Sequence, residues 1–218
     1  MTDIQQNITS IRTHIPKDVT LVCVSKFQPS EAIMQAYEAS ERDFGESRVQ
    51  ELLPKYEDLP KDIRWHFIGH LQTNKVKQIV PFVYMIHSVD SVRLLETINR
   101  EAEKIQRCIK VLLEVHVAKE ETKSGFTPKE FLSLASNLSP NNLYPWVEIC
   151  GVMGMATNTD DEQEWRRCFR EIKSLASKLS TLNTKQISMG MSDDYLVAIE
   201  EGSTMVRIGS NIFGERQY

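Results

Sequence analysis

Several features that define specialised classes of protein are missing from these 218 residues. The four cysteines, Cys23, Cys108, Cys150 and Cys168, form no C-x-x-C pair, so we expect reduced, mostly buried thiols in a cytoplasmic protein rather than a disulfide or zinc framework. No apolar run approaches the ~18 residues of a membrane span, and the polar amino terminus does not resemble a signal peptide. The net charge of −4 offers no basic surface. We therefore expect neither a membrane nor a nucleic acid as partner.

Linkers, low-complexity segments and internal repeats are also absent, which favours a single domain over residues 1–218. Short apolar runs rich in β-branched residues alternate with helical patterns along the whole chain. The runs are residues 19–25, 43–47, 64–68, 82–89, 109–117, 147–153, 186–189 and 204–208. About eight strand–helix units favour parallel pairing and closure into a single-domain (β/α)8 TIM barrel of the α/β class. An open doubly wound sheet is the alternative, but no G-x-G-x-x-G motif follows the first run.

Helical patterns separate several of these runs. Residues 30–40 open on Ser30, a suitable N-cap. Residues 91–105 place Val92, Leu95, Ile98 and Ala102 on one face. Residues 161–180 form a third amphipathic pattern. The sequence therefore predicts helices that pack an apolar face against the barrel.

Polar residues gather where the predicted strands end, which is where barrel enzymes carry their chemistry. Lys26 ends the first run, and burial there would disfavour its charged form by up to ~3–5 pKa units. Arg207 lies between Val206 and Ile208, so alternation points its guanidinium the opposite way, inward, where it needs a partner. Gly209-Ser210-Asn211 follows that run and fits phosphate binding at the N-terminus of a short helix.

Other candidates have two interpretations. Ser188 and Ser192 offer hydroxyl groups to the same phosphate, but Asp193 and Asp194 would repel it, and Ser192 is equally suited to cap a helix. His66 is flanked by aromatic residues and is more typical of a hydrogen-bonded core histidine than of a catalyst. The histidines share no metal-ligand spacing, so we expect no metal site.

The combination of an amine, an anion pocket and an inward arginine on one rim suits pyridoxal 5′-phosphate. The aldehyde of this cofactor needs a lysine, its phosphate needs a helix N-terminus, and its pyridine nitrogen needs one polar partner. A lysine beside a phosphate site also fits a Schiff-base aldolase that works without a cofactor.

Seven stretches carry a resemblance to a known family. They are VCVSKFQP (22–29), DFGESRVQEL (43–52), WHFIGHLQTNK (65–75), IHSVDS (86–91), GVMGMAT (151–157), ISMGMSDD (187–194) and GSTMVRIGSNIFGER (202–216). On these stretches the chain resembles the pyridoxal phosphate homeostasis proteins, relatives of the N-terminal barrel of alanine racemase. The resemblance implies a monomeric or weakly associating barrel that holds pyridoxal phosphate as an internal aldimine on Lys26.

The same resemblance assigns roles around the cofactor. It implies that Arg207 faces the pyridine nitrogen and that Ser192, Gly209 and Ser210 hold the phosphate. The family commonly reads F-G-E-N where this chain has Ser47 in place of the asparagine, which shortens one side chain near the cofactor. The full set of expected cofactor-binding residues is Lys26, Ser47, His66, Ser188, Gly190, Ser192, Arg207, Gly209 and Ser210.

These expectations point away from robust catalysis. An arginine partner leaves the pyridine nitrogen unprotonated, which weakens the ring as an electron sink. A two-base racemase needs an acid or base on each face of its substrate. In the full-length racemases the opposing tyrosine belongs to a C-terminal β-domain supplied by a partner subunit, and we expect that domain to be absent here.

We therefore expect no catalytic residues, and no enzyme activity other than a residual racemase-like activity. The predicted role is to store, buffer or deliver pyridoxal phosphate within the cell, in vitamin B6 and amino-acid balance. Pyridoxal-phosphate-dependent apoenzymes are the candidate acceptors. The alternatives are a pyridoxal-phosphate-dependent amino-acid racemase or lyase, and the cofactor-free aldolase.

Overall fold

The computed structural model describes residues 1–120, 124–138, 143–179 and 186–214. In these residues eight parallel strands pair in chain order, and the last strand pairs with the first, so the sheet closes into a barrel. The predicted (β/α)8 barrel is therefore confirmed, and the open sheet is excluded. The strands are β1 (Thr20–Val24), β2 (Asp43–Glu46), β3 (Arg64–Phe67), β4 (Met85–Val89), β5 (Ile109–Val115), β6 (Val147–Gly154), β7 (Gln186–Ser188) and β8 (Met205–Ile208).

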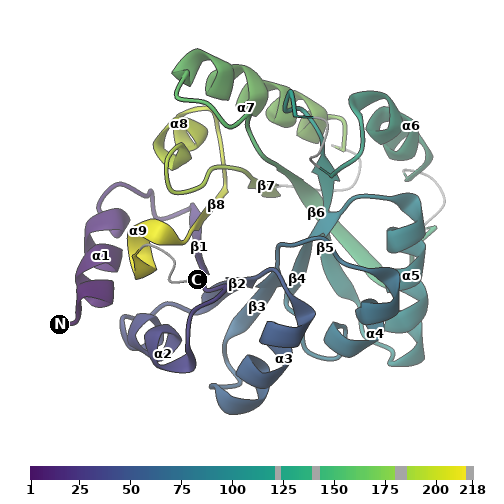
Figure 1. Cartoon of the computed structure of the whole chain (residues 1–218). Helices are drawn as coiled ribbons and strands as arrows, with labels where there is room; N and C mark the ends of the chain where they lie inside the picture. Colours follow the sequence, from purple (N-terminus) through teal and green to yellow (C-terminus); the bar gives the residue numbers. More distant parts are fainter. Residues whose placement is uncertain (121–123, 139–142, 180–185, 215–218) are drawn as a thin grey trace.

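Helices surround the strands on the outside of the barrel (Figure 1). They are α1 (Asp3–Arg12), α2 (Ser30–Glu38), α3 (Val49–Asp58), the 3-10 turn η1 (Thr73–Lys75), α4 (Val76–Ile79), α5 (Val92–Lys104), α6 (Pro128–Leu138), α7 (Glu162–Ser177), α8 (Tyr195–Glu200) and α9 (Ser210–Phe213). Each long helix turns an apolar stripe inward, because residues three and four apart share a face. Leu95, Ile98 and Ala102 of α5 are buried as predicted.

Two local predictions are wrong. Ser30 is the first residue of α2 rather than its N-cap, because Pro29 already has the extended backbone of the capping position. Val92 at the start of α5 is exposed, because the preceding Ser91 caps the helix and the buried stripe begins at Leu94. The cysteines are free thiols, but only Cys23 and Cys168 are buried, so the expectation that most of them are buried holds for half the set.

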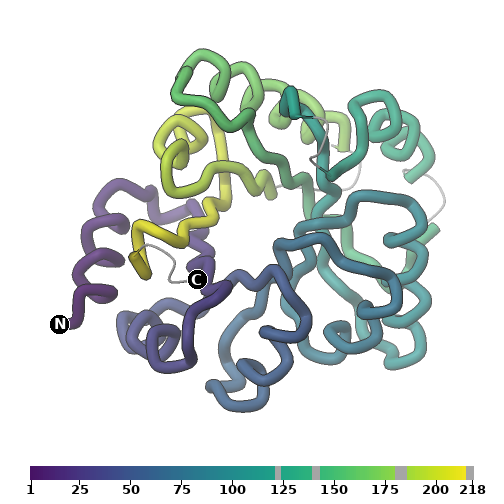
Figure 2. The backbone as a smooth tube through the Cα atoms, in the orientation of Figure 1, coloured from purple at the N-terminus to yellow at the C-terminus, as the bar shows by residue number. Residues whose placement is uncertain are grey.

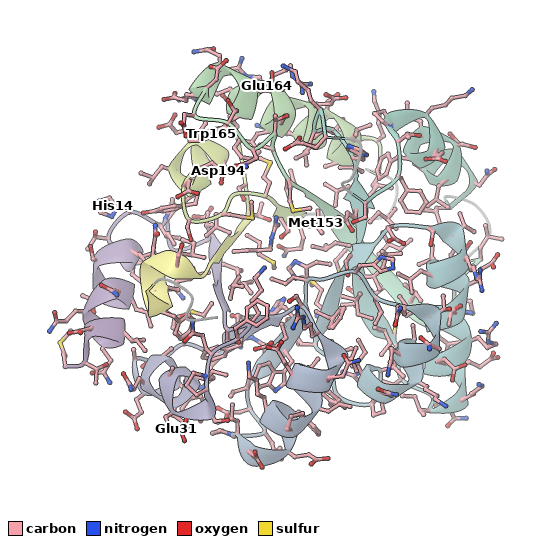
Figure 3. The ribbon with its side chains drawn as sticks, viewed as in Figure 1. His14, Glu31, Met153, Glu164, Trp165 and Asp194 are labelled. Carbon is pink, nitrogen blue, oxygen red and sulfur yellow. The ribbon has the colours of Figure 1, made fainter. Side chains whose placement is uncertain are left out.

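The barrel has two packing layers. The larger core lies between the strands and the surrounding helices and is almost entirely apolar. A small apolar cluster lies inside the barrel and consists of Val22, Met85, Leu112, Met153 and Met205. Figure 3 shows the Met153 side chain among the strands, whereas His14, Glu31 and Glu164 project from the surrounding helices and loops. The remaining inward positions near this cluster carry polar side chains, which is where the candidate chemistry begins.

The ends of the described chain meet beside β1. Helix α1 lies next to α9 (Figure 2). The Asn7 side-chain amide donates to the Ile212 carbonyl over 3.1 Å. The first helix therefore supports the last one.

Candidate functional site at the carboxyl-terminal mouth

Lys26 lies two residues beyond β1, half-buried at the mouth formed by the strand ends. The preceding Ser25 is fully buried, and its amide donates to the Gly45 carbonyl over 3.0 Å. The following Phe27 has a left-handed backbone with φ of 65°, which is uncommon outside glycine. Its amide donates to Glu51 Oε2 over 2.9 Å. Lys26 is thus held between two fixed neighbours at the point where the strand stops.

A second lysine lies below the first and has a different role. Lys55 of α3 donates from Nζ to the Ser25 carbonyl over 2.9 Å and to Glu46 Oε1 over 2.7 Å. The Ser25 hydroxyl also donates to Glu46 Oε1, over 2.6 Å. Burial raises the pKa of Glu46, and Lys55 and Ser25 oppose that shift. The ion pair is buried and fixes the backbone that carries Lys26.

Arg207 of β8 is buried inside the barrel, as predicted, and has partners there. Its Nη1 donates to the carbonyl of Ser188 over 2.8 Å and to the Ser188 hydroxyl over 2.7 Å. Its Nη2 donates to the Gly154 carbonyl over 3.2 Å. Burial lowers the pKa of Arg207 to about 10, while Asp194 and Glu114 act to raise it. The guanidinium therefore stays charged at neutral pH.

The predicted anion pocket is formed where α9 follows β8. Gly209 is the N-cap of α9, and its amide donates to the Ser192 hydroxyl over 3.4 Å. The Asn211 side chain donates to the Ser192 carbonyl over 2.8 Å. The first amides of a helix have no carbonyl partner within it, so those at Ser210 and Asn211 are available to an anion.

The fit to a phosphate rests on Gly209. A Cβ placed there would lie 3.2 Å from the Val24 carbonyl oxygen, so a side chain would crowd the end of β1, next to Lys26. Glycine lets the α9 backbone come within reach of the same space as the lysine. The residues present therefore suit a ligand with a reactive carbonyl at one end and an anionic group at the other.

The capping interpretation of Ser192 is wrong. Asp194 is the N-cap of α8, and its carboxylate accepts the Met191 amide over 2.6 Å. Burial raises the pKa of Asp194, and the Met191 amide and Arg207 oppose that shift. Figure 3 shows Asp194 beside α8, at the turn between β7 and that helix. The Ser192 hydroxyl is left facing Gly209.

Gly190 shapes the same turn. Its φ is +93°, and a Cβ there would lie 2.6 Å from Ala198 Cβ. Its carbonyl accepts the Arg207 amide over 3.0 Å. This glycine therefore connects the turn that carries Ser192 to the strand that carries Arg207.

The structure separates the remaining predicted residues. Ser188 lies inside the barrel beside Arg207 rather than at α9. Ser47 is half-buried after β2 and packs against Gly69, where a Cβ would lie 2.3 Å from the Ser47 carbonyl oxygen. His66 is fully buried, with Asp43 on one side and His87 on the other. His66 alone among the predicted residues borders a cavity at the opposite mouth.

That cavity has a volume of about 380 Å³ and opens between the first residues of the strands. Its lining consists of Thr20, Asp43, Arg64, His66, Tyr84, Met85, Lys110, Glu148, Ile149, Cys150, Gln186 and Met205. Asp43 and Arg64 form an ion pair there, with Nε–Oδ1 at 2.7 Å and Nη2–Oδ2 at 2.5 Å. We call this opening the amino mouth and the one that carries Lys26 the carboxyl mouth.

Sequence reasoning missed three residues that organise the site: Lys55, His87 and Asp43. His87 could be seen as a polar residue ending its strand, but nothing in its spacing pointed to a partner. Lys55 lies inside a helical pattern with no distinguishing neighbour, and Asp43 is the first residue of its strand, a position that surface aspartates often take. No group of three or more potential metal ligands occurs in the described residues.

Comparison with known proteins identifies the family. The family model described as "Alanine racemase, N-terminal domain" matches residues 1–217. A pyridoxal phosphate homeostasis protein of Aquifex aeolicus is 42% identical over 205 residues, covering 91% of this chain and 87% of that protein. The chain belongs to the pyridoxal phosphate homeostasis protein family. A human member of this family is 38% identical over 213 residues, which is 91% of this chain and 77% of that protein.

Solved structures agree with this assignment. PipY of Synechococcus elongatus, a structure with pyridoxal phosphate bound, is 36% identical with a TM-score of 0.89, covering 97% of this chain and 100% of that one. An alanine racemase of Clostridium difficile is similar in fold alone, with 15% identity, a TM-score of 0.81, and coverage of 99% of this chain and 57% of that one. Within the described part of this family member, no helix has the length and apolar character of a membrane span.

Proposed function

We propose that this protein binds pyridoxal 5′-phosphate through a Schiff base on Lys26 and takes part in intracellular vitamin B6 homeostasis without robust catalysis of its own. Family membership and the cofactor-bound PipY structure support the cofactor. The site proposal is supported by the position of Lys26 just after β1, the strand that pairs with β8 at Arg207 and whose end lies against Gly209. When bound, the cofactor supplies a reactive aldehyde and an aromatic nitrogen.

Each residue has a separate task in this proposal. Lys26 provides the amine, and the fixed backbone at Ser25 and Phe27 aims it across the mouth. The amides that open α9 hold the phosphate, together with Ser192, Gly209 and Ser210. Four further residues complete the proposed set. Gly190 shapes the cradle, and Ser47, Ser188 and His66 lie at greater distance from it.

Arg207 has the task that argues against strong catalysis. Arginine only donates hydrogen bonds, so a pyridine nitrogen facing it accepts one and stays unprotonated. In the described residues the guanidinium donates to oxygens of Ser188 and Gly154, and none of these partners is a carboxylate that would stabilise a protonated ring nitrogen. A binding protein that releases its cofactor to apoenzymes needs no stronger activation than this.

The test is an absorbance spectrum of the purified protein with the cofactor, before and after borohydride reduction, followed by peptide mapping. We expect a yellow protein whose label maps to Lys26, and a colourless Lys26→Ala variant. Lys75→Ala is the matched control, because Lys75 is a half-buried lysine near Ser47 on the same rim. A label on another residue, or no label, would refute the proposal.

The alternatives give different results in the same preparation. Release of D-amino acid, or of a lyase product, at ordinary enzymatic rates would support an enzyme in place of a carrier. A colourless protein whose Lys26 is trapped by borohydride only with a sugar phosphate present would support the aldolase.

A further inference from the structure

A chain of buried hydrogen bonds crosses the interior of the barrel from one mouth to the other. It begins at Arg207 Nη1, which donates to the Ser188 hydroxyl over 2.7 Å. That hydroxyl is 3.1 Å from His87 Nδ1, and His87 Nε2 is 2.8 Å from His66 Nδ1. His66 Nε2 is 3.0 Å from Asp43 Oδ1. We call these five residues the interior relay.

The two ends of the interior relay set the direction of the bonds that they make. Burial opposes the ionisation of Asp43, but hydrogen bonds from Arg64 and His66 outweigh it and lower its pKa to about 2. Asp43 is therefore an ionised carboxylate that only accepts, so His66 Nε2 carries a hydrogen. Arg207 at the other end only donates.

Burial lowers the pKa of His87 well below its ordinary value, and the nearby Arg207 charge acts in the same direction, so His87 is neutral. In the arrangement that gives His66 one hydrogen, on Nε2, its Nδ1 accepts from His87 Nε2–H. His87 Nδ1 is left as an acceptor and takes the Ser188 hydroxyl hydrogen. Every donor then points from Arg207 toward Asp43.

The arrangement leaves Arg207 dependent on residues far from it. In this arrangement the Ser188 oxygen accepts from Arg207 while its own hydrogen points to His87, which keeps that hydrogen away from the guanidinium. His66 accepts the other hydrogen of His87 and so holds that ring in its orientation. His66, His87 and Ser188 are fully or almost fully buried, so water does not substitute for any of them.

The two ends of the interior relay open on different surroundings. Arg207 lies beneath the carboxyl mouth, close to the turn at Gly190. Asp43 and His66 border the cavity at the amino mouth. The charged and titratable groups around that cavity are Asp43, Arg64, Tyr84, Lys110, Glu148 and Cys150, and the Tyr84 ring packs 5.3 Å from that of His66.

We propose that Asp43, His66, His87 and Ser188 are positioning residues for Arg207, and that they make the cofactor site at the carboxyl mouth sensitive to the charge at the amino mouth. Nothing in this role requires Asp43 or His66 to touch the cofactor. The proposal deepens the function proposed above and rests on it where the cofactor is concerned. The cavity at the amino mouth is the place from which a small polar or charged solute would act on the relay.

The first test uses the cofactor-free protein with ¹⁵N-labelled histidine. Long-range ¹H–¹⁵N correlation spectra distinguish a ring nitrogen that carries hydrogen from one that does not. We expect both His66 and His87 to carry hydrogen on Nε2 and none on Nδ1 at neutral pH. Hydrogen on Nδ1 of either residue would overturn the assigned direction, and this measurement needs no variant.

The second test compares two substitutions at the amino mouth. Asp43→Asn removes the carboxylate that ends the interior relay, and Glu148→Gln removes one that lines the same cavity without a contact to the relay. In the cofactor-loaded protein we expect Asp43→Asn to shift the pH midpoint of the visible absorbance band and to weaken cofactor affinity about fivefold. Glu148→Gln should change neither. Arg64→Gln, which removes the ion pair with Asp43 and the cation–π contact with Tyr84 but keeps the carboxylate, should have an intermediate effect.

The outcomes separate the two proposals. Wild-type protein that stays colourless would refute the proposed function, while the histidine spectra would still decide the direction of the relay. A coloured wild type with identical spectra, pH midpoint and affinity in Asp43→Asn would refute the coupling alone. Equal shifts in Asp43→Asn and Glu148→Gln would show a general charge effect and would also refute it.

If Asp43→Asn fails to fold, Ser188→Ala interrupts the relay at its other end, and an unchanged band in that variant counts against the proposal.

Discussion

The two mouths of this barrel are built from different chemistry. The carboxyl mouth presents backbone amides, hydroxyl groups and the half-buried Lys26, and the charges below it are buried with their partners, as in Lys55 and Glu46. The amino mouth presents charged side chains directly to a cavity, as in Arg64 and Lys110. Backbone groups hold a ligand in a fixed position, whereas surface charges respond to salt and pH. The carboxyl mouth is therefore suited to binding, and the amino mouth to sensing.

The largest effect should come from filling the space behind the carboxyl mouth. Gly190→Ala combines a positive φ with a Cβ 2.6 Å from Ala198 Cβ. We expect the free energy of unfolding to fall by about 4 kcal/mol in urea titrations.

Gly214→Ala is the matched control, because Gly214 also has a positive φ, of +84°, but a Cβ there would meet nothing within 4 Å. It should cost only about 2 kcal/mol, the strain of the backbone alone. Equal losses in the two variants would show that the contact with Ala198 does not limit this turn.

A smaller loss should follow when the buried pair below Lys26 is broken. Lys55→Met leaves the Glu46 carboxylate buried without its cation, and we expect a loss of about 3 kcal/mol at neutral pH by urea unfolding. Glu46 has a pKa raised by burial, so this penalty applies when the group is ionised and fades as the pH falls and it becomes protonated. The deficit relative to wild type should therefore narrow between about pH 7 and about pH 5.

Adding Glu46→Gln to Lys55→Met provides the control, because it removes the stranded charge. The double variant should recover part of the lost stability. A double variant no more stable than Lys55→Met would indicate that the lysine acts through packing and its bond to the Ser25 carbonyl instead.

The smallest of these effects concerns the amino mouth. The pKa of Asp43 is lowered to about 2 in the folded protein, below an ordinary value of about 3.9. Its contribution to stability is therefore complete above pH ~4 and is lost as the pH falls toward 2. We expect Asp43→Asn to be less stable than wild type by roughly 2 kcal/mol at about pH 6, and the difference to vanish near pH 2.

Asp62 makes the Asp43 comparison sharper, because hydrogen bonds from Tyr37 and Arg42 also lower its pKa although its side chain is 58% exposed. Solvent and salt screen such a pair. Asp62→Asn should therefore change the acid sensitivity less than Asp43→Asn, and added salt should reduce its effect further. An equal effect of the two substitutions would mean that burial at the amino mouth adds nothing to the acid sensitivity of the protein.

Much of this architecture could be predicted because the hydrophobic period and the ends of strands depend on residues that are close together in the sequence. Alternation at Val206, Arg207 and Ile208 correctly placed the guanidinium inside, and the short helix after Gly209 was found where predicted. The partners of buried groups could not be predicted in this way. Which residue faces His66 depends on the register of neighbouring strands, where Gly45 lies beside His66 on β2 and Met85 on β4.

The same limit applies to Lys55 and to the conformation at Phe27. Lys55 reaches Glu46 only because α3 packs over the end of β2, and sequence spacing does not encode that approach. The positive φ of Phe27 belongs to a residue type that seldom adopts it, so composition pointed away from it. Cavities such as the one at the amino mouth arise from the joint positions of all eight strands.

The pairing of β8 with both β1 and β7 has a consequence for biosynthesis. During translation residue 26 leaves the ribosome long before residues 209–211, whose amides would clasp the vitamer's phosphate in the proposed site. The proposed clamp therefore forms only after β8 has been made and has inserted between β1 and β7. In this proposal stable loading follows closure of the ring, so cofactor occupancy would report on completed folding of the barrel.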